Sequence, residues 1–464
     1  MVFSSPIFLF IFLPLVWILH AMLPERSRRG FLLFASLMFY IYGEGLFVML
    51  MLATITISHI SIKLIQKYEN HKTFFAATGS VLAIAILVIF KYANFFTGQL
   101  ALVLDHFGVT LVPTKFHLPL GISFFTFQAV SCIIDFYRKH ENGKVRFSDT
   151  ALYISFFPQL VAGPIVRYDN FIPQLKYRAV HYAAFFYGLK RFAYGFAKKV
   201  LISNNLAPVV DKIFAMEPSS MGTAAAWMAP LLFGIQLYFD FSGYSDMAIG
   251  LARMFGIKIP ENFRYPFAAT SMTNLWRRWH LSLSTWFRDY LYIPLGGSRK
   301  GEFRTIVNIW IVFAVCGLWH GAAWNFVLFG VVSAFFMTIE RFFKKYVHSQ
   351  NKFLAHFYVI CIVFPVFFAS FRSNSVAGFF GLIRSMYVPA ASSPELMQLF
   401  DAKTLAAAAA GLVFGFPVYG LITAKFGKFR IFKCLEAAFL ILLFAAALSS
   451  SSMIFSDPFI YFRF

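Results

Sequence analysis

The strongest constraint on the fold of this sequence is a series of long apolar runs, separated by short segments that hold most of the lysine and arginine. The first run extends from Pro6 to Leu23 and the last from Cys434 to Leu448. A helix that crosses the hydrocarbon core of a bilayer needs about 20 apolar residues, and several runs reach that length. Only 13% of the 464 residues are charged, against about a quarter in soluble proteins. We therefore predict an all-α integral membrane protein with about eleven transmembrane or re-entrant helices.

The apolar runs recur from one end of the sequence to the other, and no long polar or Pro/Ser-rich linker separates them. The prediction is therefore one polytopic membrane domain over residues 1–464, without a dedicated soluble domain. The first run has no basic segment before it and is followed by Arg26, Arg28 and Arg29. We interpret it as a retained span and not as a cleaved signal peptide.

The formal net charge of +21 would suggest a nucleic-acid partner if the protein were soluble. Here the basic residues lie in short loops between apolar runs, which is typical of cytoplasmic loops in membrane proteins. The sequence thus predicts contact with membrane lipid and no contact with nucleic acid. Placing the basic loops in the cytoplasm puts the N- and C-termini on the outer side, the periplasm of a bacterium. The same basic rim could also attract a polyanionic ligand such as a phosphorylated coenzyme.

The segment from Ala151 to Pro164 has too few apolar residues to cross the bilayer and return, and its Phe-Pro and Gly-Pro pairs interrupt a helix. One interpretation is a re-entrant segment, whose broken backbone must be buried in protein or face a watery cavity. A short loop on the cytoplasmic surface is an equally good interpretation.

A single histidine, His320, lies in an apolar run from Ile306 to Phe336 that contains no Asp, Glu, Lys or Arg. Ionisable groups at such positions are rare and usually functional, although a hydrogen-bonded core histidine is the alternative. Gly317 and Gly321 flank it at helical spacing and would let another helix or a ligand approach closely.

Basic clusters lie on both sides of this run, and they are Arg299, Lys300, Arg304 before it and Arg341, Lys344, Lys345 after it. If both clusters are cytoplasmic, the residues between Thr305 and Glu340 must cross the membrane and return. About 54 Å of helix is just enough for such a hairpin. Its turn then falls near His320, away from the cytoplasm.

The segment from Thr273 to Leu295 predicts an aromatic-rich helix at the membrane interface. Its apolar stripe is Trp276, Trp279, Leu283, Trp286, Phe287 and Tyr290, and its polar stripe is Arg278, Ser282, Thr285 and Asp289. His280 falls at the edge of the apolar stripe. Spacing alone leaves a functional histidine and a packed, hydrogen-bonded histidine equally open.

Two acids, Asp240 and Asp246, lie within the apolar run from Thr223 to Leu251. Carboxylates are costly in lipid unless they are paired or face a cavity. For Asp240, a structural role beside an arginine or beside hydroxyl groups is at least as good an interpretation as a catalytic one.

The two histidines suit general base catalysis, because an imidazole titrates near neutrality and can take a proton from an attacking hydroxyl or thiol. No metal site is predicted, since no third His or Cys and no paired carboxylates lie at ligand spacing. The sequence also contains no Gly-rich nucleotide loop and no Gly-x-Ser-x-Gly motif.

Five motifs together resemble the membrane-bound O-acyltransferase family, and within it the branch of alginate O-acetyltransferase membrane subunits. They are Arg277–Gly297, Gly317–Gly321, Phe156–Pro164, Tyr238–Asp246 and Pro458–Phe462. The longest of them, Arg277–Gly297, reads Arg-Arg-Trp-His-Leu-Ser-Leu-Ser-Thr-Trp-Phe-Arg-Asp-Tyr-Leu-Tyr-Ile-Pro-Leu-Gly-Gly. The Tyr-Ile-Pro-Leu-Gly-Gly ending favours this branch over the related D-alanyl transfer subunits of teichoic acid modification.

The resemblance implies a helical membrane domain, with a family core at roughly 118–371, whose helices surround a central funnel or tunnel. It implies that His320 is catalytic and that His280 supports it. It further implies that acetyl groups pass from cytoplasmic acetyl-CoA, a co-substrate and not a tightly bound cofactor, through the bacterial inner membrane. A periplasmic acetyltransferase with a serine nucleophile would then complete the transfer to a polysaccharide.

From this we expect His320 to act as general base, with either a neutral His280 or an aromatic wall of Trp276, Trp279 and Trp319 orienting the acyl thioester. Basic residues at the inner mouth would hold the coenzyme phosphates, and the candidates are Arg277, Arg278, Arg299 and Lys300. Asp240, Arg288 and Asp289 are expected to support the site.

Three alternatives to this function and acceptor remain open from the sequence. A transporter of polysaccharide or lipid-linked sugar would need a polar cavity in a basic multi-span protein, although the sequence has no matching halves. An inactive docking platform for soluble acetyltransferases would tolerate replacement of both histidines. The acceptor polymer could also be peptidoglycan or cellulose.

Overall fold

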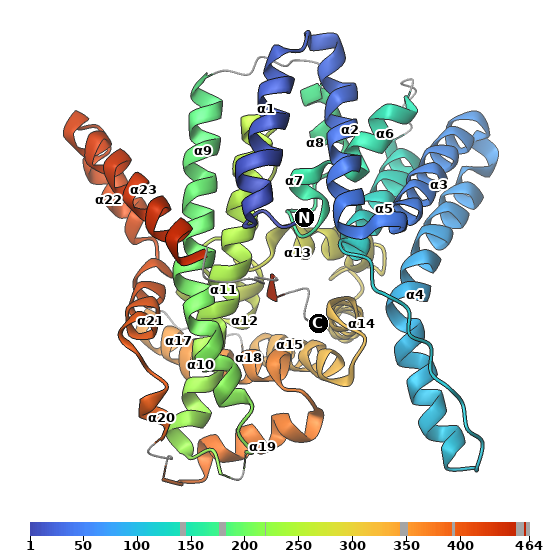
Figure 1. Cartoon of the computed structure of the whole chain (residues 1–464). Coiled ribbons are helices and arrows are strands. Elements are labelled where there is room, and N and C mark those ends of the chain that lie inside the picture. Colours follow the sequence, from blue (N-terminus) through green and yellow to red (C-terminus); the bar gives the residue numbers. More distant parts are fainter. Residues whose placement is uncertain are drawn as a thin grey trace. The chain divides into compact units, whose positions relative to one another are not determined.

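The structure is a computed structural model that describes residues 1–139, 145–175, 182–218, 220–343, 351–391, 395–451 and 459–460. Every regular element in these ranges is a helix, which confirms the predicted all-α class (Figure 1). The chain forms two compact units, of which the first comprises Met1–Phe192 with Met247–Pro260 and the second Ala193–Asp246 with Glu261–Phe464.

Seven helical stretches of the described residues are long and apolar enough to cross a bilayer. They are Glu25–Lys67, Glu69–Asp105, Thr223–Met254, Glu302–His320, Trp324–Phe342, Lys352–Arg372 and Arg430–Ser451. Two further helices, which meet at 63°, count as an eighth span if they form one broken crossing. The protein is therefore a multi-pass membrane protein. The expected total of about eleven also included shorter and re-entrant segments, such as the apolar helix Phe8–Met22.

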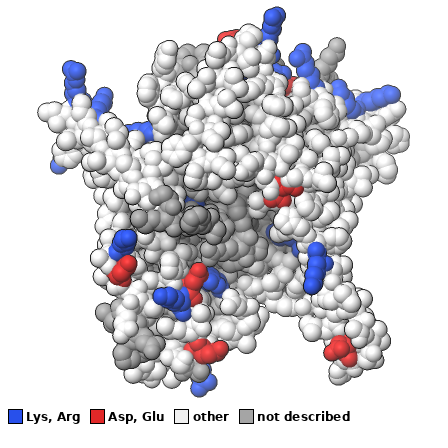
Figure 2. All heavy atoms as spheres, in the orientation of Figure 1, with Lys and Arg blue, Asp and Glu red and all other residues white. Residues whose placement is uncertain are grey.

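Charged side chains are sparse over the face drawn in Figure 2, where most of the surface belongs to residues other than Lys, Arg, Asp and Glu. Many large apolar side chains are exposed on the spanning helices, and examples are Phe74, Val81 and Ile89. A surface of this kind suits contact with lipid chains, where no hydrogen-bonding water is present.

The first unit is built from successive helices with short connections. They are α1 (Leu13–Met22), α2 (Glu25–Glu44), α3 (Val48–Lys67), α4 (Lys72–Asp105), α5 (Ile122–Lys139), α6 (Phe147–Ser155), α7 (Phe157–Leu160), α8 (Tyr168–Phe171) and α9 (Tyr182–Ala197). Ile65, Ala76 and Ile133 form a core where α3, α4 and α5 pack together. Gly45, with a φ of 55°, begins the short turn between α2 and α3, and glycine adopts this backbone conformation without strain.

The interrupted segment after residue 150 is buried inside the first unit. All residues from Asp149 to Val166 are buried. Its free backbone groups find protein partners, because the Phe157 N–H donates to Ser36 Oγ at 3.1 Å and the Tyr153 hydroxyl donates to Val166 O at 2.8 Å. The structure therefore supports burial of a broken backbone and excludes a surface loop.

The second unit takes up the end of α9 and contains most of the remaining helices. They are α10 (Asn204–Phe214), α11 (Thr223–Met254), α12 (Met272–Trp276), α13 (Leu281–Phe287), α14 (Glu302–His320), α15 (Trp324–Phe342), α17 (Lys352–Tyr358), α18 (Phe364–Arg372), α19 (Val376–Tyr387), α20 (Glu395–Gln398), α21 (Ala402–Phe414), α22 (Val418–Phe426) and α23 (Arg430–Ser451). Helices α21 and α22 form the bent pair.

Helices α14 and α15 form the predicted hairpin, and α14 ends at His320 (Figure 1). The two helices pack through glycine, because a Cβ on Gly317 would collide with the Phe326 carbonyl and a Cβ on Gly330 with that of Phe313. A Cβ on Gly321 would collide with the Phe326 ring. The predicted close approach at the glycines is therefore confirmed. Lys344 and Lys345 lie outside the described residues, as does most of the motif Pro458–Phe462.

Candidate active site

The predicted continuous helix from Thr273 to Leu295 is wrong, because the backbone breaks at His280. Helix α12 ends at Trp276 and α13 begins at Leu281. Between them His280 adopts the left-handed conformation, with φ 44° and ψ 53°. A non-glycine residue takes this conformation only where its surroundings hold it there. Sequence periodicity carries no sign of such a break.

The break is held by hydrogen bonds to an extended segment that precedes it. The Leu281 N–H donates to Asn262 O at 2.9 Å, and the Arg264 N–H donates to Arg278 O at 2.9 Å. His280 has no exposed surface, so its ring lies inside the protein and not at a lipid-facing edge. These contacts give the histidine a fixed position between two helices.

One amide fixes the protonation pattern of the His280 ring. Asn262 Oδ1 accepts from the Ser282 N–H at 3.2 Å and from the Ser282 hydroxyl at 2.9 Å, which identifies this atom as the acceptor. His280 Nδ1 lies 3.2 Å from the same oxygen. The proton therefore belongs on Nδ1, and Nε2 carries the lone pair.

Burial also lowers the pKa of His280 to about 3. The residue lies outside the helices that span the membrane. Desolvation penalises the imidazolium form, so burial favours the neutral imidazole. The role expected of a neutral His280 stays a prediction.

His320, the last residue of α14, has surroundings made of aromatic rings. Its ring centroid lies 5.0 Å from that of Trp319, 5.3 Å from Phe329 and 5.4 Å from Phe371, with the rings close to perpendicular. The residue is 5% exposed. Such packing fixes the plane of the imidazole and removes bulk water from it.

Trp319 connects the two histidines. Its ring lies 5.9 Å from that of His280 and 5.0 Å from that of His320. The structure thus brings together the two histidines that the sequence singled out. They lie on either side of Trp319, a member of the expected aromatic wall. The two histidines are far apart in the sequence, and α14 brings His320 close to the segment that carries His280.

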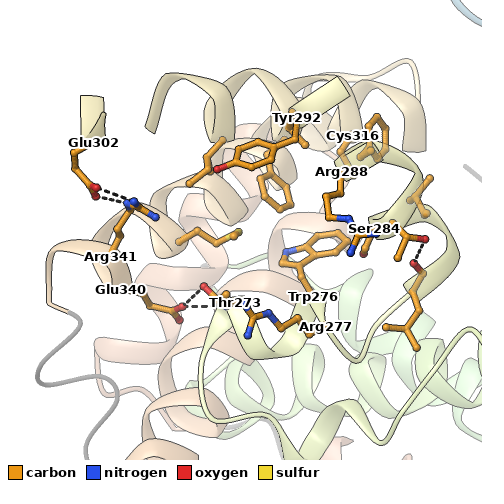
Figure 3. A pocket seen from close by; sticks show the side chains of 18 residues that line it. Thr273, Trp276, Arg277, Ser284, Arg288, Tyr292, Glu302, Cys316, Glu340 and Arg341 are labelled. Atoms are coloured by element: carbon orange, nitrogen blue, oxygen red, sulfur yellow. Dashed lines mark hydrogen bonds and ion pairs between the residues drawn. The ribbon is translucent and has the colours of Figure 1, made fainter. Parts of the chain in front are cut away.

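A cavity of about 790 Å³ lies in the same unit, bounded by α12, α13, α14 and α15 (Figure 3). Trp276, Arg277 and Arg288 line it, as do Tyr292 and Cys316. At one end Arg341 pairs with Glu302, with Nη2 at 2.7 Å from Oε2 (Figure 3). A cavity with apolar walls and a few charged groups is typical of a small-molecule site.

The cavity follows one face of α14. Its lining residues on that helix run from Glu302 to Cys316, about 21 Å at 1.5 Å per residue. Cys316 lies one helical turn before His320. Phe329 contacts both Trp276 in the wall, at 6.1 Å, and His320, at 5.3 Å. One ring therefore connects the wall of the cavity with the histidine.

Other expected site residues do not line this cavity. Arg278 donates to Asn274 Oδ1 at 2.9 Å and to Arg264 O at 3.1 Å. Trp279 packs in the core beside Phe263, at 5.1 Å. Asp289 pairs with its neighbour Arg288 at 2.8 Å. Arg299 and Lys300 are exposed and are likewise absent from the lining.

Both acids of the apolar run in α11 form ion pairs. Asp240 binds Lys199 at 2.7 Å and Asp246 binds Lys198 at 2.7 Å. Asp240 therefore has the expected structural partnership, with a lysine where the sequence suggested an arginine or hydroxyl groups. Close approach of the two segments is possible at Gly243, where a Cβ would lie 2.7 Å from the Gly195 carbonyl.

Two residues that hold the site were missed by the sequence analysis, namely Asn262 and Glu340. Glu340 is 2% exposed and accepts the Thr273 N–H at 3.0 Å and the Thr273 hydroxyl at 2.9 Å. It thereby caps the helix that carries Trp276. A buried acid at the end of an apolar helix is a weak signal that could have identified Glu340. Asn262 has no comparable signal, because its partners are distant in the sequence.

Among the described residues, no group of three His, Cys, Asp or Glu side chains is arranged to hold a metal ion. Three arginines line the cavity, and Arg341 is paired with Glu302, so Arg277 and Arg288 are the candidates for contact with a charged ligand. The arrangement as a whole offers a largely apolar cavity with a few charged groups and, close to it, two positioned imidazoles.

Comparisons with known proteins agree with this arrangement. The family model of the membrane-bound O-acyltransferase family matches residues 65–373. A probable alginate O-acetylase of Azotobacter vinelandii is 43% identical over 346 residues, covering 74% of this chain and 69% of that protein. The peptidoglycan O-acetyltransferase of Helicobacter pylori is 35% identical over 387 residues, covering 76% and 72%.

A more distant relative is the teichoic acid D-alanyltransferase of Bacillus subtilis, which is 32% identical over 241 residues, covering 49% of this chain and 60% of that protein. All these relatives carry names of acyl-transferring enzymes. The range matched by the family model includes both histidines and the whole lining of the cavity. The chain therefore belongs to the membrane-bound O-acyltransferase family and is a multi-pass membrane acyltransferase.

Proposed function

We propose that the protein moves acetyl groups from a cytoplasmic thioester, acetyl-CoA, toward O-acetylation of an exopolysaccharide such as alginate. The observation that carries the proposal is the cavity that follows α14 from the Glu302–Arg341 pair to within one turn of His320. A long channel with a charged mouth suits a linear thioester arm with phosphates at its outer end. The name of the Azotobacter vinelandii relative supports a polysaccharide acceptor.

Two arginines that line the cavity bind the donor in this proposal. Arg277 and Arg288 hold the phosphates through charge-assisted hydrogen bonds. The indole of Trp276 and the ring of Phe313, 5.1 Å apart, guide the arm toward the histidines. Arg278 takes no part, because it does not line the cavity.

His320 acts as general base. It takes the proton of the acceptor hydroxyl as the oxygen attacks the acetyl carbonyl. The carbon–sulfur bond then breaks, the thiol leaves with the proton that His320 returns, and the acceptor carries the new ester. His280 stays neutral and, with Trp319, holds His320 and the thioester in the orientation needed for attack. Holding the reacting groups in this orientation raises the rate of the chemical step.

The basic loops determine the proposed orientation in the membrane. Arg299, Lys300 and Arg304 precede α14, and Arg341 lies at the end of α15, so the positive-inside rule puts the mouth of the cavity in the cytoplasm. The histidines then lie toward the periplasm, as do the chain termini. A periplasmic serine acetyltransferase receives the acetyl group and completes its transfer to the polymer, and the membrane is the bacterial inner membrane.

Replacement of His320 by Ala tests this function. Polymer O-acetylation should be abolished, while the amount of membrane-inserted protein stays at the wild-type level. The matched control is His356→Ala, which alters a partly exposed histidine of the same unit. Polymer acetylation that survives in the His320 variant would contradict general base catalysis and would support a docking platform.

The purified protein, with its partner acetyltransferase, should also release CoA from acetyl-CoA. A transporter of sugar polymers would release none. The Helicobacter pylori relative is named for peptidoglycan, so ester-linked acetate should be measured on both exopolysaccharide and peptidoglycan from cells that carry and lack the gene. Loss of acetate from peptidoglycan alone would replace the proposed acceptor.

A further inference from the structure

The carboxylate of Asp240 joins three parts of the second unit. Its Oδ1 accepts from Lys199 Nζ at 2.7 Å, and its Oδ2 accepts from the backbone N–H of Ile460 at 2.7 Å. The Lys199 and Asp240 side chains are 1% and 2% exposed. A buried carboxylate that lost either partner would keep an uncompensated charge, so this arrangement strongly favours one position for Ile460.

The residue before Ile460 is held in the core by this attachment. Phe459 has no exposed surface. Its ring lies 4.9 Å from Tyr244 and 5.4 Å from Phe241, both on α11. The backbone hydrogen bond therefore delivers an aromatic side chain to the same helix face that carries Asp240.

Phe241 transmits this packing to the candidate active site. Its ring meets His280 edge to face, with the centroids 4.6 Å apart and an interplanar angle of 86°. Asn262 fixes one edge of the imidazole by a hydrogen bond at 3.2 Å. A hydrogen bond alone leaves the ring free to tilt about it, whereas a packed ring on the other side removes that freedom.

We infer that Phe459 and Ile460 are positioning residues for His280, seated by Asp240 and acting through Phe241. The inference rests on the proposed function, because it assigns the effect to a histidine of the site. It gives a role in catalysis to a motif near the end of the sequence and to the ion pair in α11, neither of which lines the cavity.

A purely structural role is the competing explanation. Loss of a buried phenylalanine destabilises a protein wherever it lies, because it leaves a cavity in the core. The two roles differ in which kinetic constant changes and in whether Phe241 is required. A positioning role lowers kcat of the folded protein and leaves the donor KM unchanged, because the donor arginines are elsewhere.

A double-mutant cycle separates them. Phe459→Ala and Phe241→Ala should each lower kcat several-fold, up to about tenfold, and the double variant should be no worse than Phe241→Ala alone. The matched control is Phe444→Ala, which removes a comparable ring contact, at 5.3 Å from Phe196, away from His280. It should leave kcat unchanged. All measurements use the full chain with its partner acetyltransferase and are normalised to inserted protein.

The backbone hydrogen bond is tested separately. Ile460→Pro removes the N–H that Asp240 accepts, whereas Ile460→Ala keeps it and changes only the side chain. The proline variant should reproduce the kcat loss of Phe459→Ala, and the alanine variant should stay close to wild type. Equal losses in both variants would overturn the inference.

Independent, multiplicative effects of the Phe459 and Phe241 variants would also overturn it, as would an equal loss in the Phe444 control. Failure of the proposed function gives a different result. In that case His320→Ala remains active and the wild-type protein releases no CoA, whatever the Phe459 variants do.

Discussion

The two histidines of the candidate site have surroundings of opposite kinds. His280 is held by a polar group, since Asn262 accepts its Nδ1–H and also binds Ser282 and Ser245. His320 sits among the edges of aromatic rings at 5.0–5.4 Å. Trp319 contacts both.

This difference suggests a division of labour. A hydrogen bond fixes the tautomer of an imidazole, and a ring with a fixed tautomer is suited to orienting other groups. Aromatic packing fixes the plane of the imidazole, and a general base must be held in a defined orientation toward its substrate. We therefore propose orientation as the role of His280 and proton transfer as the role of His320.

Asparagine at each histidine position gives the largest expected contrast. His320→Asn should lower kcat by about 10²–10⁴-fold, because an amide cannot act as a base. His280→Asn keeps an N–H that can reach the Asn262 oxygen and should retain kcat within about tenfold of wild type. The measurement is acetyl transfer by purified protein with its partner. An equal loss in both variants would remove the distinction between the two histidines.

The pH profile of the same variants sharpens this contrast. Because burial lowers the pKa of His280 to about 3, its neutral form persists as the pH falls through the range in which the protein is active. The acid limb of the activity profile should therefore be unchanged in His280→Asn. A shifted acid limb would mean that His280 itself titrates.

An intermediate effect is expected from the partner of His280. Asn262→Ala leaves three buried donors, one on His280 and two on Ser282, without their acceptor. An unmade buried hydrogen bond costs about 1–3 kcal/mol, and kcat should fall about tenfold. Ser245→Ala removes only the acceptor of Asn262 Nδ2, which lies 3.1 Å away, and should have a smaller effect. If the serine variant lost more activity, the tautomer argument would fail.

The smallest effect on catalysis is expected at an arginine in the wall of the cavity. Arg288→Gln should raise the donor KM about tenfold or less, since the side chain is exposed and its charge is screened by solvent. The kcat value should not change, because both histidines keep their contacts. Arg278→Gln is the matched control and should leave KM unaltered. A fall in kcat without a change in KM would place Arg288 nearer the reacting groups.

The hairpin around His320 could be predicted from the sequence because its determinants are local. Basic residues lie at both ends, charge is absent between them, and Gly317 marks the closest approach. Its turn therefore falls where the charge pattern puts it. The direction of each helix across the membrane follows from the same rule and stays a prediction.

The surroundings of His280 could not be predicted because they depend on distant residues. The helical periodicity of Thr273–Leu295 contains no trace of the left-handed residue, which Asn262 holds from outside the segment. Asp240 is similar, since its acidic character indicated a partner but not that the partner was Lys199. Pairs of this kind are set by tertiary packing, which single-sequence periodicity does not contain.

The Lys199–Asp240–Ile460 contact also implies an order of events during synthesis. Lys199 emerges 41 residues before Asp240, and Ile460 emerges 220 residues after it. An unpaired lysine is costly in an apolar interior, so the lysine segment cannot settle until α11 has been made. The carboxylate then keeps one unfilled position until Ile460 has been made. The backbone N–H of Ile460 thus joins a site whose other two members were synthesised long before it.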